Sequence, residues 1–308
     1  MTATDPHRAV VDGIALTIYS ARTPGANAAT PASAETPAPA STDKTDGATT
    51  ADVSGPSVAI VWPAMGTPAG FYRRFAQELQ AAGLTAVVAD LRGTGESGPA
   101  PTRTSRWAYR QLAASVGTVL AAVRRWYPSG KAILVGHSLG GQAALLHLAA
   151  EPGAPVDGLV LVAVGLPYWR AYRRGGSAVL AYTQGINAVS TVLRVWPGWT
   201  LGGRQARGVI SDWADSARTG RYRVDVDAAL PAMRTPVLAI SFDGDRYTPH
   251  GTLDHLLAKV PAAPVTRERL RLPAVDGRPV HFAWVRESAT VAARIASFVA
   301  ALPAEPSR

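Results

Sequence analysis

The stretch AILVGHSLGGQAALLHLAA, residues 132–150, decides the fold of this chain. It begins with an apolar run of strand length and ends with an alanine- and leucine-rich run of helix length. Between the two stands Gly136-His137-Ser138-Leu139-Gly140, a Gly-x-Ser-x-Gly pattern. In a sharp turn from a strand into a helix, a serine at this position is exposed at the edge of a sheet, and glycines are needed where a side chain would collide with backbone. We therefore predict that Ser138 is a nucleophile; an ordinary glycine-rich turn is the alternative.

Further strands and helices alternate on both sides of this stretch. Mostly apolar runs of strand length lie at residues 58–62, 85–89, 159–164 and 236–241, and a last strand is predicted at residues 268–272. Helical periodicity marks the segment through Phe71, Phe75 and Leu79, then residues 107–127, 141–150 and 253–260, and a final helix through Val291, Ile295, Phe298 and Leu302. Strands that are apolar along their whole length are buried on both faces. The predicted fold class is therefore α/β, with a mostly parallel sheet covered by helices on both faces.

The chain divides into parts of different character. Residues 1–20 hold a pair of short strands with Asp12-Gly13 as their turn. Residues 21–57 consist mostly of Ala, Thr, Pro, Ser and Gly, so we expect a disordered loop there. Residues 58–165 and 231–304 form the core. Residues 166–230 are helical in character, without a clear strand, and predict a helical cap, or lid, inserted before the penultimate strand.

Composition excludes several classes of site and partner. The 308 residues contain no cysteine, which rules out disulfides and thiolate metal sites. The first ten residues lack the apolar core of a signal peptide, and no apolar run approaches the roughly 18–20 residues of a membrane span. We expect a cytoplasmic protein without a transmembrane segment. The net charge is +9, but no nucleic-acid motif accompanies it, so we expect no nucleic-acid partner.

Further motifs resemble those of a known family. The segment DLRGTGES, residues 90–97, matches an Asp-x-Arg-Gly-x-Gly-x-Ser turn. With this turn and the motif around Ser138, the chain from Val58 to its C-terminus resembles the α/β-hydrolase superfamily. More narrowly, GFYRRF at residues 70–75, GHSLGGQ at residues 136–142 and Tyr168-Trp169 resemble a group of predicted, poorly characterised bacterial α/β-hydrolases. The resemblance implies a catalytic triad in the chain order serine, acid, histidine.

A serine hydroxyl needs a base to act at neutral pH, and the base needs an orienting acid. Three histidines lie well after the serine motif, namely His250, His255 and His281. His281 follows the last predicted strand, in a loop ahead of the final helix, where the resemblance implies the catalytic histidine. Val280 stands where the family usually has glycine. We predict His281 as the base; a loop histidine without a catalytic role is the alternative.

The acid is expected after the strand at residues 236–241. This strand runs into FDGDRYTP, residues 242–249. In the family, the acid usually stands four residues before a proline that opens the next helix. Asp245 has this spacing to Pro249 and is our choice, with Asp243 as the second candidate.

The remaining histidines near these motifs are assigned no catalytic role. Adjacent side chains on a turn point apart, so His137 is expected to be a packing or polar neighbour of Ser138. His147 lies on the predicted helix after the serine and is expected to be structural. His250 is expected at the surface, at a helix start.

An oxyanion hole needs two backbone N–H groups aimed at one point. One should come from Leu139, the residue after the nucleophile. The other should come from PAMG, residues 63–66, which follows the first core strand. Pro63 has no N–H and cannot donate. We prefer Met65 as the donor, with Ala64 second.

The predicted cap is strongly basic. Between residues 167 and 223 it holds two acids, Asp212 and Asp215, and nine arginines, a difference of 9 − 2 = +7: Arg170, Arg173, Arg174, Arg194, Arg204, Arg207, Arg218, Arg221 and Arg223. It also holds Trp169, Trp196, Trp199 and Trp213. One hypothesis is a lid that binds an anionic substrate group, with Trp169, Arg170 and Arg173 as the binding residues. The alternative is a solvated basic face with tryptophans packed on the core.

These motifs predict a serine hydrolase that cleaves an ester, thioester or related acyl bond of a small molecule through an acyl-enzyme. Such chemistry needs no cofactor and no metal. An acyltransferase on the same triad is one alternative, because it differs only in the group that accepts the acyl chain. A non-catalytic binding protein with this fold is the other.

Overall fold

The computed structural model of the chain describes residues 6–21, 55–200, 202–223, 225–272 and 277–303. Within these ranges one eight-stranded sheet has the order β1-β2-β4-β3-β5-β6-β9-β10. Its strands are β1 (His7–Val11), β2 (Ile14–Tyr19), β3 (Val58–Trp62), β4 (Thr85–Ala89), β5 (Ala132–His137), β6 (Gly158–Val162), β9 (Val237–Phe242) and β10 (Val265–Leu270). Most of the predicted disordered loop, residues 21–57, lies outside the described residues, namely its positions 22–54.

The sheet is parallel from β4 to β10, with an antiparallel pair at one edge. Strand β5 lies between β3 and β6, so that Leu134 stands opposite Ile60 on one side and Leu159 on the other. Strands β1 and β2 form a hairpin, and β2 pairs antiparallel with β4. Asp12 and Gly13 turn this hairpin with φ of 48° and 74°, as the primed turns of tight hairpins require. The predicted strand pair and mostly parallel sheet are confirmed.

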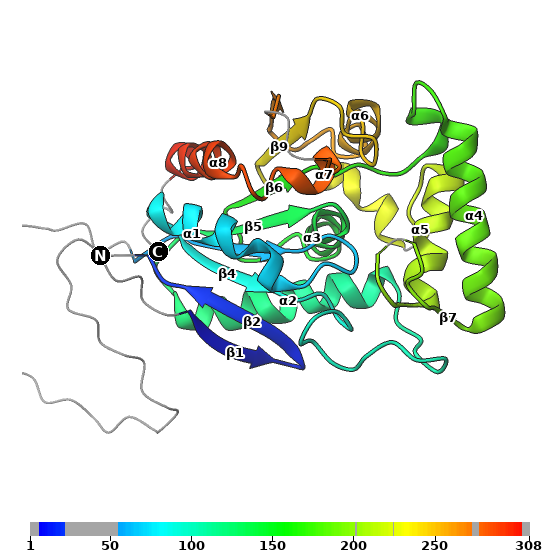
Figure 1. Ribbon diagram of the computed structural model, residues 1–308. Coiled ribbons are helices and arrows are strands. Elements are labelled where there is room, and N and C mark those ends of the chain that lie inside the picture. Colours follow the sequence, from blue (N-terminus) through cyan, green and yellow to red (C-terminus); the bar gives the residue numbers. More distant parts are fainter. Residues whose placement is uncertain (1–5, 22–54, 201, 224, 273–276, 304–308) are drawn as a thin grey trace, which may run out of the picture.

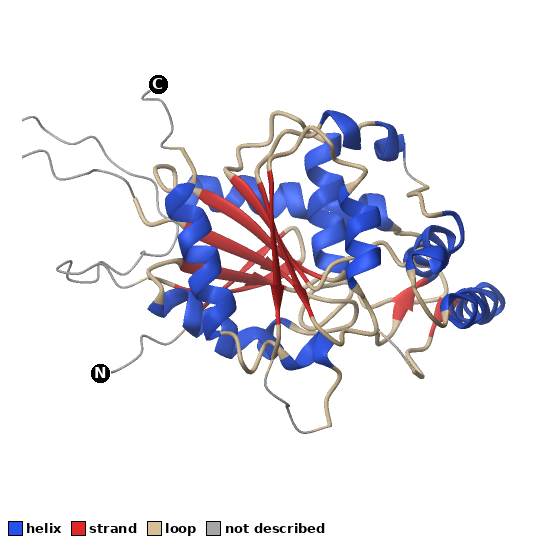
Figure 2. Ribbon diagram, turned by 90° about the horizontal axis from the view of Figure 1, so that it is seen from above, coloured by secondary structure: helices blue, strands red, loops and turns tan. Residues whose placement is uncertain are grey.

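Helices cover both faces of the sheet, as Figure 2 shows. One buried apolar cluster includes Val116 of α2 (Tyr109–Trp126) and Leu145 of α3 (Leu139–Ala150). The other includes Phe75 of α1 (Arg73–Ala81) and Ile295 of α8 (Ala289–Ala301). The remaining helical segments of this core are η1 (Ala69–Tyr72), α6 (His250–Leu257) and α7 (Val280–Ala283). Burial on both faces explains why the central strands are apolar throughout.

Several predicted elements differ from the structure at their ends, and two of the differences concern the last strand and the segment around His281. The last strand was predicted at residues 268–272, but β10 is Val265–Leu270. It pairs only with β9 at the sheet edge, and its partly exposed surface accepts charged residues, so no apolar run marks its start. His281 was expected in a loop, but it lies in the short helix α7. A single helical turn is too short to produce a readable periodicity.

Between β6 and β9 the chain leaves the sheet and forms the segment that we call the cap, residues 166–230. It contains α4 (Gly176–Leu193), α5 (Arg207–Thr219), η2 (Trp169–Ala171) and η3 (Asp225–Ala228), and η4 (Leu230–Ala232) begins at its last residue. In Figure 1, α4 and α5 stand at the right, on the side toward which β5 points. No strand was predicted there, but β7 (Val195–Trp196) pairs with β8 (Gln205–Ala206). Two-residue strands are too short to be recognised by alternation.

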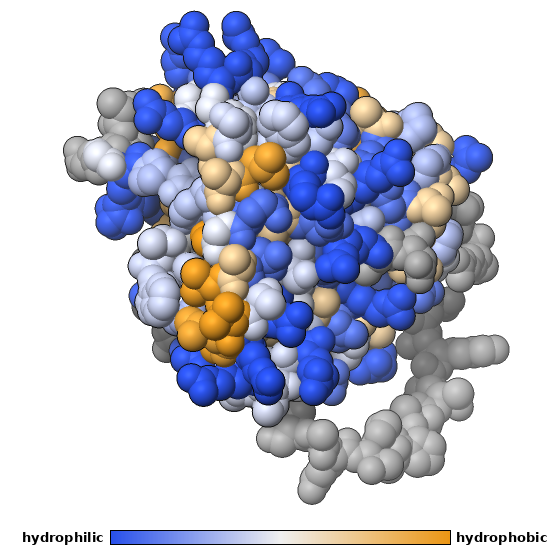
Figure 3. Space-filling view, turned by 90° about the vertical axis from the view of Figure 1, so that its right-hand side faces the viewer, coloured by the Kyte–Doolittle hydropathy of each residue, from blue (hydrophilic) through white to orange (hydrophobic). Residues whose placement is uncertain are grey.

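Figure 3 views the face on which α4 and α5 lie. Hydrophilic side chains cover most of this face, and a strip of apolar side chains crosses it. Val192 of α4 is the most exposed large apolar side chain among the described residues, at 81%. No helix in the described ranges is both long and apolar enough to cross a lipid bilayer.

Candidate active site

The turn between β5 and α3 holds Ser138 in a conformation that non-glycine residues rarely adopt. Its φ is 52° and its ψ is −119°. A side chain on Gly136 would collide with the backbone of Gly141, and one on Gly140 would collide with the carbonyl of Trp62. Backbone strain of this kind costs about 1–3 kcal/mol and clusters at functional sites. The turn therefore has the strained strand-to-helix geometry that the motif predicts.

Asp245 and His281 form a buried hydrogen-bonded pair. His281 Nδ1 lies 2.9 Å from Asp245 Oδ2, and the two side chains are 3% and 0% exposed. Asp245 also accepts hydrogen bonds from the backbone N–H groups of Tyr247 and Thr248 and from the Thr248 hydroxyl, at 2.8, 3.1 and 2.8 Å. Burial alone would raise the pKa of Asp245. The hydrogen bond and the charge of His281, together with the hydrogen bonds from Thr248, outweigh burial and lower this pKa. The carboxylate is thus held charged against the imidazole.

The second acid candidate, Asp243, has different partners. Its carboxylate lies 3.2 Å from His250 Nε2 and 3.5 Å from Arg271 Nε. Hydrogen bonding to His250 is the main cause that lowers its pKa, although its side chain is exposed. Asp243 therefore belongs to a surface group of charges, and His250 is part of it.

Met65 and Ala64 are the two candidates for the second N–H group of the oxyanion hole, and the structure distinguishes them. The N–H of Ala64 donates to the Tyr72 hydroxyl at 2.9 Å. No acceptor for the N–H of Met65 occurs in the described part of the chain. Leu139 is the first residue of α3, where an N–H has no acceptor inside the helix. Both Met65 and Leu139 line the same cavity as Ser138.

A buried aromatic network, which the sequence did not reveal, lies behind these groups. The Tyr72 hydroxyl is 2.7 Å from His137 Nδ1, and Trp284 Nε1 donates to His137 Nε2 over 3.4 Å. An indole can only donate, so His137 Nε2 accepts, and the neutral ring then donates from Nδ1 to Tyr72. Burial, with repulsion from His281, lowers the pKa of His137 well below its usual value. The neutral His137 ring therefore orients the Tyr72 hydroxyl, and this hydroxyl accepts the hydrogen bond from the backbone N–H of Ala64.

Ser138 and His281 open onto one cavity of about 240 Å³, here called the Ser138 cavity. The core contributes Met65, Leu139, Gln142 and Phe282 to its wall, and the cap contributes Tyr172, Val179, Tyr182, Thr183 and Trp213. Among the described residues, Arg246 is the one Arg, Lys, Asp or Glu side chain in the wall. The cap therefore closes over the serine and makes the cavity mostly apolar and aromatic.

The sequence matches the model of a known family. A family model described as serine aminopeptidase, S33, matches residues 57–227, more than half of the chain. The chain belongs to this family. The resemblance to α/β-hydrolases and the predicted fold class are confirmed, and membership indicates a hydrolase. No curated protein matches the sequence.

Solved structures share the fold of this S33-family chain. A monoacylglycerol lipase from Paleococcus ferrophilus has 15% identity over 80% of this chain and 96% of its own, with a TM-score of 0.55. Est1E from Butyrivibrio proteoclasticus, solved with ferulic acid, has 13% identity over 96% and 99%, with a TM-score of 0.58. An enol-lactonase from Burkholderia xenovorans has 15% identity over 96% and 100%, with a TM-score of 0.55. At these identities the likeness is one of fold.

In this S33-family chain the motif at residues 90–97 has a structural position. Asp90 accepts hydrogen bonds from the N–H groups of Ala69 and Glu96 at 2.6 and 2.9 Å. Ser97 donates to the Asp90 carbonyl and accepts from the N–H of Ala15. The motif therefore ties the β-hairpin and the start of η1 to the end of β4.

The three predicted substrate-binding residues of the cap lie apart from the Ser138 cavity wall. Trp169 and Arg170 are on η2, with the Arg170 guanidinium 4.9 Å from the Trp169 ring centre. Arg173 is exposed just after them. None of these three is among the residues that line the Ser138 cavity. Tyr172, between them in sequence, does line it.

The remaining histidines have structural partners. His147 is buried against Gly117, and burial lowers its pKa. His255 Nε2 bonds to the Gly220 carbonyl at 2.9 Å, which joins α6 to the cap. Among the described residues, no group of three or more His, Asp or Glu side chains could hold a metal ion.

Proposed function

We propose that this S33-family hydrolase cleaves esters or thioesters of small molecules through an acyl-enzyme on Ser138. The observation that supports this most is the buried hydrogen bond from His281 to Asp245, with His281 and Ser138 lining one cavity. Among hydrolase chemistries, a nucleophilic serine is the one that uses this combination.

The order of proton transfers follows from the hydrogen bonds. A charged Asp245 can only accept, so His281 donates from Nδ1 and its Nε2 is free to take a proton. In our proposal Nε2 removes the Ser138 proton as Oγ attacks the acyl carbon. The N–H groups of Met65 and Leu139 stabilise the resulting oxyanion. His281 then protonates the leaving alcohol or thiol, and water attacks the acyl-enzyme by the same route in reverse.

The wall of the Ser138 cavity favours esters over the substrates of an aminopeptidase. An enzyme that recognises a free α-amine needs a carboxylate near the scissile bond. No Asp or Glu lines this cavity within the described ranges, whereas Arg246 does. The described wall of the Ser138 cavity therefore lacks the negative charge that an aminopeptidase needs. An arginine at the wall favours an acyl compound with a neutral or anionic leaving group.

We propose two further features of this protein. Trp169, Arg170 and Arg173 would contact an anionic group of the substrate outside the cavity, next to Tyr172. Replacing Arg170 and Arg173 with Gln should raise KM for anionic esters only; an equal rise for neutral esters would contradict this. We also expect the protein to act in the cytoplasm, because a chain without cysteine is unaffected by reducing conditions.

The test is labelling with a fluorophosphonate probe, which reacts with activated serines. The unmodified protein should label, and the Ser138→Ala and His281→Ala variants should not. Hydrolysis of a short ester should fall by about 10⁴-fold or more in Ser138→Ala. A folded protein that neither labels nor hydrolyses esters would contradict the proposal and favour a binding role.

A further inference from the structure

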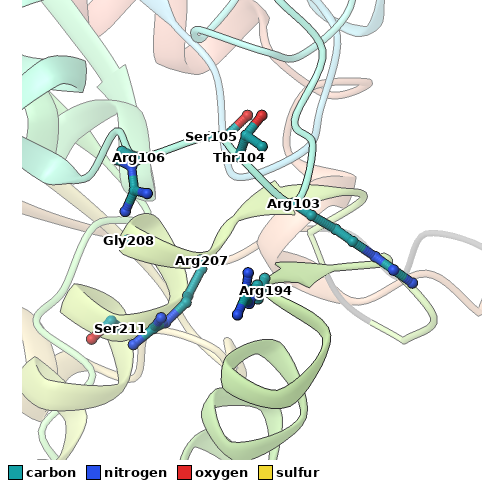
Figure 4. A pocket seen from close by; sticks show the side chains of 8 residues that line it. All are labelled: Arg103, Thr104, Ser105, Arg106, Arg194, Arg207, Gly208 and Ser211. Atoms are coloured by element: carbon teal, nitrogen blue, oxygen red, sulfur yellow. The ribbon is translucent and has the colours of Figure 1, made fainter.

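A second cavity, larger than the first, lies between the core and the cap. It has a volume of about 490 Å³ and is lined by Arg103, Thr104, Ser105, Arg106, Arg194, Arg207, Gly208 and Ser211. We call it the basic pocket. Its walls come from the loop before α2, the end of α4 and the start of α5 (Figure 4). The basic pocket and the Ser138 cavity share no residue.

The four arginines of the basic pocket carry uncompensated charge. None of them forms an ion pair with a carboxylate in the described part of the chain. In Figure 4, Arg106, Arg194 and Arg207 surround the hollow from three segments, while Arg103 extends away from them. Four like charges at one cavity repel one another, so the arrangement gains free energy when an anion enters.

The two acidic residues near the basic pocket, Asp212 and Asp215, have other partners. Asp212 accepts the backbone N–H of Tyr109 at 3.0 Å, and Asp215 pairs with Arg218 and Arg223. Neither acid lines the basic pocket. The hollow therefore has no negative side chain of its own among the described residues.

The start of α5 lies at the same hollow. Its N-cap residue, Ala206, has no side chain that can accept a hydrogen bond, and its first turn holds no acid. Arg207 and Gly208, both in the pocket wall, are the first two residues of this 13-residue helix. Their N–H groups have no acceptor within the helix, and the helix dipole favours an anion there. The backbone and the arginine side chains thus favour the same kind of ligand.

Side chains from the core and the cap meet across the basic pocket. Arg103 and Arg106 belong to the core, while Arg194 and Arg207 belong to the cap. Arg204 of the cap donates to the carbonyl of Pro101 at 2.7 Å and fixes this junction. A ligand with a single charge would leave most of the arginines unpaired. Two or more charges on neighbouring groups, as in a phosphorylated compound, suit arginines from both sides.

We propose that the basic pocket binds a small phosphorylated compound that carries at least two negative charges. This site is separate from Ser138, and the proposal does not depend on the hydrolase activity. Binding should therefore persist in the Ser138→Ala variant.

The test is calorimetric titration of the full chain with inorganic pyrophosphate at about 0.15 M salt, where distant surface charges are screened. The pocket variant is Arg194→Gln with Arg207→Gln. The matched control is Arg125→Gln with Arg286→Gln, which removes two exposed arginines outside the pocket. We expect Kd to rise at least about tenfold in the pocket variant, as loss of charge-assisted hydrogen bonds implies, and to stay unchanged in the control. No binding, or equal weakening in both variants, would overturn the proposal.

A second measurement needs no variant. Phenylglyoxal modifies accessible arginines, and peptide mapping should find that pyrophosphate protects Arg194 and Arg207 but leaves Arg125 reactive. Absence of this selective protection would overturn the proposal. Vesicles of phosphatidylglycerol test the other source of phosphate. Binding to vesicles without binding to pyrophosphate would make the ligand a membrane surface and would overturn the small-ligand proposal.

Discussion

The Ser138 cavity and the basic pocket both lie against α5, yet they differ in volume, in the polarity of their walls and in charge. Trp213 of α5 lines the first, while Gly208 and Ser211 of the same helix line the second. The Ser138 cavity is the smaller of the two, at about 240 Å³ against 490 Å³. Its wall is mostly apolar and aromatic, and Arg246 is its one Arg, Lys, Asp or Glu side chain among the described residues. The wall of the larger cavity holds exposed arginines that form no ion pair with a carboxylate in the described part of the chain.

This difference separates chemistry from recognition. The Asp245–His281 pair is buried, and the Asp245 carboxylate accepts hydrogen bonds from His281, Tyr247 and Thr248, which fix the orientation of the pair. The arginines of the basic pocket sit on long, exposed side chains, which suits attraction of an anion but not the positioning of reacting atoms. The larger of the two cavities is therefore not the one that contains the predicted nucleophile. The predictions that follow test how strictly activity is confined to the Ser138 cavity.

The largest effect is expected from the two neighbouring acids. Asp245→Asn should lower kcat for a short ester by about 10⁴-fold, because an amide no longer orients and stabilises the charged imidazole. Asp243→Asn is the matched control, since its exposed carboxylate contacts His250 and Arg271 and not His281. Steady-state kinetics with both variants measures this. A larger loss in Asp243→Asn would reverse the assignment of the acid.

A smaller loss is expected when the support of the oxyanion loop is removed. Tyr72→Phe deletes the hydroxyl that accepts from Ala64 and contacts His137, so the neighbouring Met65 N–H should be less well aimed. We expect kcat to fall by roughly 10- to 100-fold with little change in KM. Tyr109→Phe is the control, because that buried hydroxyl has no partner among the described residues. Equal losses in both variants would indicate a general packing effect.

Cavity size should limit the acyl chain. A volume of about 240 Å³ is below the usual range of ligand pockets, so we expect a preference for acyl groups of about two to four carbons. Trp213→Ala should enlarge the cavity and shift the ratio of kcat/KM toward longer chains by roughly tenfold. Trp199→Ala, which removes a 68% exposed tryptophan outside the wall, should not change the ratio. An unmodified protein that prefers long chains would show that the acyl group lies elsewhere.

The smallest effect concerns stability and pH. The folded-state pKa of His137 is well below its unfolded value of about 6.5, so the unfolded chain binds the extra proton first. Burial of the neutral His137 ring stabilises the folded protein fully at pH values above the unfolded pKa. This stabilisation is lost as the pH falls below the unfolded pKa. The loss amounts to about 1.4 kcal/mol of unfolding free energy per pH unit, until the folded pKa is reached.

Urea unfolding between pH 5 and pH 8 measures this dependence. His137→Gln should be less stable than the unmodified protein at pH 8, because it loses the contacts to Tyr72 and Trp284. Its stability should, however, decline less steeply toward pH 5. Parallel pH dependences in the two proteins would mean that His137 is protonated in the folded state.

The sequence by itself determined the fold and the local geometry around Ser138. The strand, the tight glycine turn and the helix of residues 132–150 are each specified by neighbouring residues, because turn sterics and apolar periodicity are local properties. The sequence also named Asp245, His281, Leu139 and Met65 as candidates, by their spacing and their place in the chain order. Their roles in the reaction stay predictions.

Only the tertiary structure decided which partners these residues have. Tyr72, His137 and Trp284 are separated by 65 and 147 positions, so no local pattern indicates that they form one network. The same holds for Ala64, whose N–H is taken by Tyr72, and for the arginines that meet in the basic pocket. Contacts of this kind depend on how strands and cap pack together. A charge count along the cap revealed its excess of arginine, but only packing divided those arginines between a cavity wall and open surface.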